Sequence, residues 1–273
     1  MRLPPASVLA SWPTPNYDHP ITRGPAGKIV AITLTVLVAL ILVMRVYTRL
    51  RVVRSFGLDD ILILIAFFPS VALTVCSIYS EFELGWDVHV WDLPFTKYSP
   101  SSQMSLVTFV LFDISSNLVK LSTLAMLYRL VHTTESRLTV IVVSIAVFVV
   151  VSGLLFMFIT IFQCSPVSDY WTLSSQPQKC IDEAAHLLVA GTINTVTDFA
   201  IVVLPIKMTA ALQLPRRQHI ILYALFCTGF CACAAGCVRT YYTWILTTKY
   251  DKTWYGWTVW ISSVIELYLG IVS

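Results

Sequence analysis

Ionisable and amide side chains recur at helical spacing inside long apolar segments of this sequence. Asp113, Asn117 and Lys120 are four and three residues apart, which places all three on one face of a helix. Asn194 and Asp198 show the same four-residue spacing in a later segment. Ionisable groups are costly in lipid, so such residues indicate a functional site unless they form structural pairs.

Two more charged residues, Arg239 and Glu266, lie in the last two apolar segments. If these faces turn inward, they create an interior polar site with both signs of charge. Positioned carboxyl groups transfer protons in many enzymes, so the candidate catalytic acids are Asp198, Asp113 and Glu266. The candidate ligand contacts are Asn117, Lys120, Asn194, Arg239 and His89. The competing interpretation is a set of buried pairs that fix helix register, such as Asp198 with Arg239 or Lys120.

His89 lies in a polar loop between Asp87 and Asp92. A histidine beside carboxylates can shuttle protons or bind a metal, but one histidine is a weak metal signal. A solvated residue at the membrane interface is the commoner case, and Trp86 and Trp91 fit an aromatic belt there. We therefore predict no metal site.

The motif Gly57-Leu58-Asp59-Asp60 opens another apolar segment. Acidic residues at this position cap free backbone N–H groups and suit the helix dipole. We expect a structural role for both carboxylates.

Six of the seven cysteines fall into two groups. Cys164 and Cys180 lie in a loop that we place on the oxidising side of the membrane, so a disulfide is expected, the alternative being two free thiols. Four others, in the sixth apolar segment, occupy two different helix faces and cannot meet at one ion. We interpret them as small packing residues: Cys227, Cys231, Cys233 and Cys237.

The elements that position these residues follow from composition. Of 273 residues, 57% are hydrophobic and 12% charged, against about 25% charged in soluble domains. The net charge of +3 is spread along the chain, which argues against a nucleic-acid binder. A membrane-spanning helix needs about 20 apolar residues, and seven candidates occur. They are Ile29–Met44, Ile61–Ser80, Met104–Tyr128, Leu138–Gln163, Ala184–Ile206, Ile220–Leu246 and Trp254–Ser273.

The predicted fold is therefore an all-α, polytopic bundle of seven transmembrane helices. Residues 1–26 form a proline-rich polar tail that does not resemble a signal peptide, and residues 27–273 form the membrane domain. The last span ends at Ser273 without a following tail, so we expect a shortened seventh helix. Arg and Lys are more frequent in the loops after the first, third and fifth spans, which predicts an outer or lumenal N-terminus.

Several short motifs follow one another along the sequence. Arg49 precedes Gly57-Leu58-Asp59-Asp60, and His89-Val90-Trp91-Asp92-Leu93 and Lys120-Leu121-Ser122 follow. Further along stand Phe162-Gln163-Cys164-Ser165-Pro166, Trp171, Cys180, Asn194, Asp198, Arg239 and Glu266. From Ile29 to the end, the chain resembles the fungal rhodopsin-domain family of integral membrane proteins. The family includes a membrane protein of the satratoxin gene cluster and seven-helix surface-sensing receptors. Asp87 departs from the family, which usually has glycine there.

The resemblance implies a multi-pass protein of the endoplasmic reticulum or plasma membrane that serves a secondary-metabolite, mycotoxin-type pathway. One form of this function is a membrane-embedded cyclase or isomerase that needs no cofactor and acts on an apolar small molecule. The alternatives are a receptor that partners a G protein and, ranked last, a transporter. The expected partners are the lipid bilayer and the small molecule, without nucleic acid. Retinal is not expected, because Trp254–Ser273 contains no lysine for a Schiff base.

Overall fold

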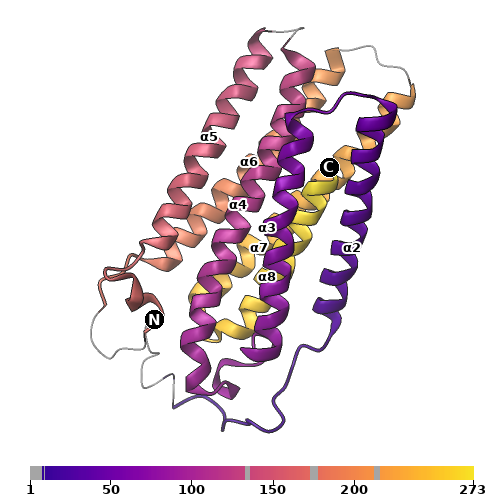
Figure 1. Cartoon of the computed structure of the whole chain (residues 1–273). Coiled ribbons are helices and arrows are strands. Elements are labelled where there is room, and N and C mark those ends of the chain that lie inside the picture. Colours follow the sequence, from indigo (N-terminus) through magenta and orange to yellow (C-terminus); the bar gives the residue numbers. More distant parts are fainter. Residues whose placement is uncertain (1–7, 9, 133–135, 173–177, 212–215) are drawn as a thin grey trace.

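The computed structural model describes the chain except residues 1–7, 9, 133–135, 173–177 and 212–215. Within this described part of the chain, seven long helices form a bundle (Figure 1). They are α2 (Ala26–Tyr47), α3 (Leu58–Glu83), α4 (Tyr98–Val131), α5 (Ser136–Ile161), α6 (Glu183–Ala211), α7 (Arg216–Thr248) and α8 (Lys252–Val272). Among the described residues, six helices, all but α7, are long and apolar enough to cross a membrane. The predicted all-α membrane bundle is confirmed.

Each predicted span falls within one of these helices, apart from its last residues in two cases. The fourth span was predicted to reach Gln163, but α5 ends at Ile161. The seventh was predicted to reach Ser273, and α8 ends at Val272. Continuous apolar runs form helices here because a helix satisfies its own backbone hydrogen bonds in lipid.

The start of α3 shows how its opening motif acts locally. Gly57 is in an extended conformation, and its backbone N–H donates to Asp60 Oδ2 at 3.3 Å. This bond is half of a capping box, so the predicted capping role of Asp60 is confirmed.

Helix α8 is the element against which most of the others pack. It contacts α2, α3, α4 and α7. Tyr268 is 1% exposed, and its hydroxyl lies 2.8 Å from Thr35 Oγ1 of α2 and 3.0 Å from Thr74 Oγ1 of α3. A second apolar cluster, which includes Leu124, Val149 and Ile201, joins α4, α5 and α6.

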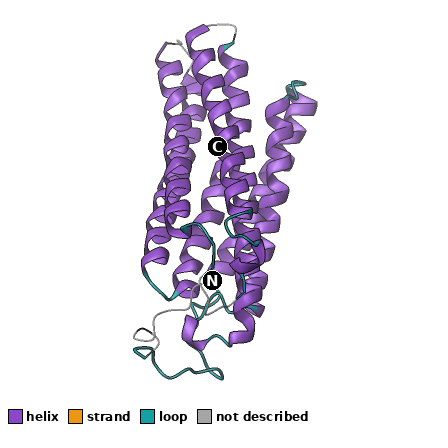
Figure 2. Cartoon of the chain, turned by 90° about the vertical axis from the view of Figure 1, so that its left-hand side faces the viewer, coloured by secondary structure: helices purple, strands orange, loops and turns teal. Residues whose placement is uncertain are grey.

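The two ends of the bundle differ. The loop end comprises residues 84–97, 162–172, 178–182 and 249–251 and includes three short helical turns, η2 (Val90–Asp92), η3 (Phe95–Lys97) and η4 (Val167–Tyr170). The N-terminal segment lies at this end (Figure 2). Here the Arg23 backbone N–H donates to the Asp87 carbonyl oxygen at 3.1 Å. The arginine end comprises residues 45–57 and Arg129 and includes the π-helical turn η1 (Thr48–Val52).

Candidate functional site

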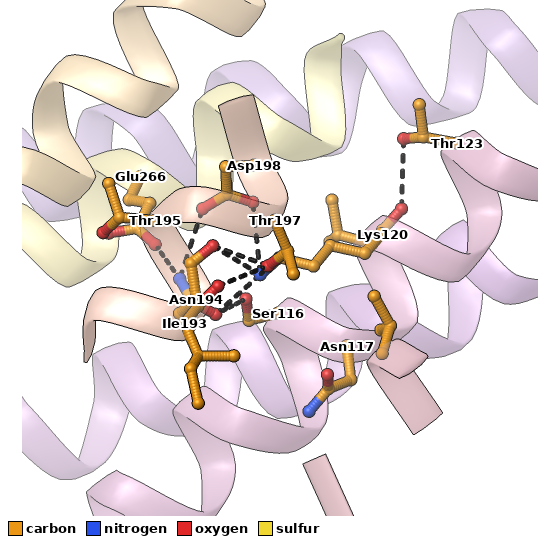
Figure 3. A network of polar contacts seen from close by, with 12 residues as sticks. Ser116, Asn117, Lys120, Thr123, Ile193, Asn194, Thr195, Thr197, Asp198 and Glu266 are labelled. Atoms are coloured by element: carbon orange, nitrogen blue, oxygen red, sulfur yellow. Dashed lines mark hydrogen bonds and ion pairs between the residues drawn. The ribbon is translucent and has the colours of Figure 1, made fainter. Parts of the chain in front are cut away.

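Lys120 of α4 lies at the centre of a polar network in the bundle interior (Figure 3). Its Nζ donates to the Asn194 carbonyl oxygen and Oδ1, both at 2.9 Å, and to Thr197 Oγ1 at 2.7 Å. Asp198 Oδ1 is 3.4 Å away. The predicted alternative pairing of Asp198 with Lys120 is therefore present, and it joins α4 to α6.

Arg239 of α7 and Glu266 of α8 form a second ion pair beside the first. Arg239 Nε lies 2.7 Å from Glu266 Oε2, and Nη2 lies 3.4 Å from Oε1. Asn194 connects the two pairs, because its Nδ2 lies 2.8 Å from Glu266 Oε1 and 3.2 Å from Asp198 Oδ2. We call these five residues the charge cluster. The proposed direct Asp198–Arg239 pair does not form, since Glu266 takes the guanidinium.

Glycines allow the helices around the charge cluster to approach closely. A Cβ atom on Gly236 of α7 would lie 3.3 Å from Glu266 Oε2, and one on Gly191 of α6 would lie 3.3 Å from Thr240 Oγ1. Both distances are tighter than ordinary packing. Small residues in membrane helices serve this purpose generally.

A cavity of about 1100 Å³ extends from the charge cluster to the loop end. Lys120, Asn194 and Arg239 line this cavity. Asp198 and Glu266 are not among its described lining residues. Much of the remaining wall is apolar and aromatic and includes Leu73, Phe109, Phe112, Phe148, Phe156 and Trp260. A cavity of this size that combines apolar walls with polar groups at its two ends is suited to a small molecule.

Asp113 and Asn117 line the same cavity but lie apart from the charge cluster. Asn117 Nδ2 donates to Asp113 Oδ1 at 2.9 Å. The Asn117 side chain points away from the cluster (Figure 3) and lies against Gly153 of α5. The structure thus divides the predicted site into a cavity-wall pair and a charge cluster.

The cavity also reaches the outer surface of the bundle between α5 and α6. Val151 and Leu155 of α5 and Val189 of α6 line it, and these side chains are half or more exposed. Exposed apolar side chains on a spanning helix face lipid, so this side of the cavity adjoins the bilayer.

At the loop end, the cavity meets polar residues that the sequence did not single out. His186 Nε2 lies 3.0 Å from Thr160 Oγ1, and the His186 ring stacks on Phe156 at 4.7 Å. The Tyr170 hydroxyl donates to Glu183 Oε1 at 3.0 Å, and burial raises the pKa of Tyr170 above its ordinary value. The three-residue spacing of Glu183 and His186, which places both on one helix face, was the sequence feature that could have indicated this polar group.

His89 lies outside the described wall of the cavity. Its ring stacks between Trp91 at 4.5 Å and Trp254 at 4.0 Å, and its Nδ1 is 2.6 Å from Asp251 Oδ2. The side chain is 19% exposed, which differs from the solvated residue expected. Its partner is Asp251 rather than Asp87 or Asp92, because the start of α8 packs on this loop.

The sequence reasoning missed an ionic network at the arginine end. Arg45 Nε lies 3.0 Å from Asp60 Oδ1, and Arg49 Nη2 lies 3.6 Å from Asp59 Oδ2. Both carboxylate side chains are almost fully buried. The four-residue spacing of Arg45 and Arg49 was the signal that could have revealed these pairs.

The predicted disulfide is confirmed, because Cys164 and Cys180 are bonded at the loop end. Of the α7 cysteines, Cys233 is buried, while Cys227, Cys231 and Cys237 are exposed. Among the described residues, no three His, Cys, Asp or Glu side chains are grouped as a metal site would require.

Residues 44–273 match the fungal rhodopsin domain. The chain belongs to this family. It is therefore an integral, multi-pass membrane protein. The match covers the charge cluster, the cavity wall and the disulfide.

Several relatives carry functional names. The chain is 28% identical over 205 residues to wortmanamides biosynthesis cluster protein C of Talaromyces wortmannii, covering 73% of this chain and 55% of that protein. It is 22% identical over 241 residues to fugralins biosynthesis cluster protein 2 of Gibberella zeae, covering 87% and 59%. It is 26% identical over 214 residues to receptor GIN3 of Arthrobotrys oligospora, covering 75% and 49%. No solved structure shows significant similarity to the chain.

Proposed function

We propose that this protein serves a fungal secondary-metabolite pathway by binding an apolar intermediate in the interior cavity and converting it through proton transfer. A cyclase or isomerase reaction fits this description and needs no cofactor. Two relatives named for biosynthesis clusters support the pathway. The cavity, which adjoins lipid between α5 and α6, supports the apolar nature of the intermediate.

The position of Asp113 on the cavity wall is the observation that carries the catalytic part of the proposal. Asp198 and Glu266 are engaged by Lys120 and Arg239. Among the described residues, Asp113 makes no ion pair, and Asn117 holds its carboxyl group by a hydrogen bond. A carboxyl group positioned in this way can exchange a proton with a bound molecule. We therefore assign the acid–base role to Asp113 ahead of Asp198.

Metabolite profiling of a deletion strain tests the assignment. Wild-type protein should clear the intermediate that accumulates, and Asp113→Asn should lower clearance by about 10²–10⁴-fold, the usual contribution of an acid or base. Asp18→Asn, in an exposed part of the N-terminal segment, is the matched control and should behave as wild type. Equal amounts of folded protein must be present in isolated microsomes. Full turnover by Asp113→Asn excludes this residue.

A second candidate is a seven-helix receptor that signals through a G protein, favoured by the similarity to receptor GIN3. The cavity would then hold a ligand that is not converted. If the protein is a receptor, its deletion should change the whole metabolite profile together with transcript levels. Addition of the ligand to cells that express the protein should change the cAMP level. Accumulation of one specific intermediate contradicts the receptor.

A further inference from the structure

The two cations of the charge cluster differ in the donors that they leave free. An ammonium group has three N–H donors. Those of Lys120 are matched by the Asn194 carbonyl oxygen, Asn194 Oδ1 and Thr197 Oγ1 at 2.7–2.9 Å, with Asp198 beyond them. Lys120 therefore has no donor to offer to a molecule in the cavity.

Arg239 is in the opposite situation. A guanidinium has five N–H donors, and Glu266 accepts from Nε and from one hydrogen of Nη2. Among the described residues, the other donors, on Nη1 and Nη2, have no hydrogen-bond partner. Arg239 is only 7% exposed and lines the cavity. These donors face the cavity, so a molecule bound there can accept a charge-assisted hydrogen bond from them.

The surroundings of Arg239 leave space beside these donors. Gly191 of α6 lies next to Nη1, since a Cβ there would be 3.5 Å from this atom. The Phe112 ring lies 4.7 Å from Cζ and holds the guanidinium plane by a cation–π contact. Both residues also line the cavity.

Charge balance decides what kind of acceptor fits. The cluster holds two cations, Lys120 and Arg239, and two carboxylates, Asp198 and Glu266. An anionic ligand would add an uncompensated negative charge to an interior where buried charge is expensive. The Asp113 carboxyl on the same cavity wall would disfavour a second carboxylate further.

We propose that the cavity recognises an apolar molecule through one neutral oxygen acceptor, such as a ketone, ester or amide carbonyl, held by the unpaired donors of Arg239. This rests on the proposed binding of an apolar intermediate and adds its chemical class and orientation. The carbonyl end lies at the charge cluster, and the apolar remainder extends toward the loop end.

Photo-crosslinking to the full chain in lipid nanodiscs tests the inference with three probes. They are a diazirine-bearing long-chain methyl ketone and the alkane and carboxylic acid of the same length. A hydrogen bond to a charged donor predicts about tenfold higher labelling of cavity residues by the ketone than by the alkane. The carboxylic acid should label no better than the alkane.

Two glycine variants provide a matched comparison. Gly191→Ala places a methyl group beside Arg239 Nη1 and should lower ketone labelling to the alkane level. Gly236→Ala places a methyl group 3.3 Å from Glu266 Oε2 of the same ion pair. Gly236 is not among the lining residues of the cavity, so this variant should keep the ketone preference. Identical behaviour of the two variants overturns the role of Arg239.

The wild-type comparison does not depend on the folding of any variant. Equal labelling by ketone and alkane, or stronger labelling by the acid, overturns the inference. Ketone-selective labelling that depends on Gly191 supports it even if Asp113→Asn complements the deletion strain, in which case only the proposed conversion fails.

Discussion

Glu266 is the residue on which the pairing of Arg239 depends. Its Oε2 lies 2.7 Å from Arg239 Nε, and its Oε1 lies 2.8 Å from Asn194 Nδ2. Both partners of the ion pair are more than nine-tenths buried. Breaking such a pair leaves one charge uncompensated in the interior, whereas replacing both partners by apolar residues often costs little.

Glu266→Gln should therefore lower the free energy of unfolding by about 3–5 kcal/mol. Thermal unfolding of the purified protein in detergent measures the change. Glu83→Gln, on an exposed residue at the end of α3, should change it by less than about 0.5 kcal/mol. The double variant Arg239→Met, Glu266→Leu should recover most of the loss. If the double variant is as unstable as Glu266→Gln, uncompensated charge is not the cause.

The spacing of Asp113, Asn117 and Lys120 predicted a shared helix face, and all three do line the cavity. The choice of partners could not be predicted in the same way. It depends on the rotation and depth of α6, α7 and α8 relative to α4, and a single sequence contains neither quantity. The sequence alone therefore leaves Asp198 among the candidate acids, whereas its contact with Lys120 in the structure distinguishes it from Asp113.

Ion pairs connect α2 and α3 at the arginine end, in addition to the apolar core that the two helices share. Arg45 and Arg49, at the end of α2 and in the following turn, face the buried carboxylates of Asp59 and Asp60 across the arginine end. Ser122 of α4 donates to the Asp59 carbonyl oxygen at 2.6 Å, which adds a third helix. The capping role was predictable because a helix start has a local signature, whereas the ion pairs require the two helices to meet.

Asp60→Asn should weaken this connection, because it removes the charge that Arg45 contacts at 3.0 Å and weakens the acceptor of the Gly57 N–H. Hydrogen bonds to charged groups contribute about 1.5–3 kcal/mol each, and we expect a loss in that range. Limited proteolysis at the arginine end and thermal unfolding both report it. Asp18→Asn should leave both unchanged, and an Asp60→Asn protein as stable as wild type would refute the structural role.

The molecule as a whole has a predicted direction in the membrane. The bonded Cys164–Cys180 pair lies at the same end as the N-terminal segment, and disulfides persist on the oxidising side of a membrane. The excess of Arg and Lys in the loops of the opposite end predicts the same orientation. Composition and the length of the continuous apolar segments were enough to predict the helical bundle, because lipid permits few alternatives to a helix.

Two single substitutions test the orientation, since each completes an N-glycosylation acceptor sequence at one end. Asp18→Thr does so with Asn16 at the loop end, and His132→Asn does so with Thr134 near the arginine end. On expression in a eukaryotic host, only Asp18→Thr should gain a glycan, seen as a mass shift that glycosidase removes. A glycan on His132→Asn instead would reverse the orientation.

The side of the cavity between α5 and α6 adjoins the bilayer, as the exposed wall residues Val151, Leu155 and Val189 indicate. An apolar molecule partitions from water into the membrane. The concentration that sets occupancy of the cavity is therefore the mole fraction of this molecule among the lipids. Apparent affinity expressed in aqueous molarity should then shift with the amount of membrane in the assay. Occupancy measured at constant mole fraction should not change with the amount of membrane. A cell that expands or reduces the membrane around the protein would thereby change the occupancy of the cavity.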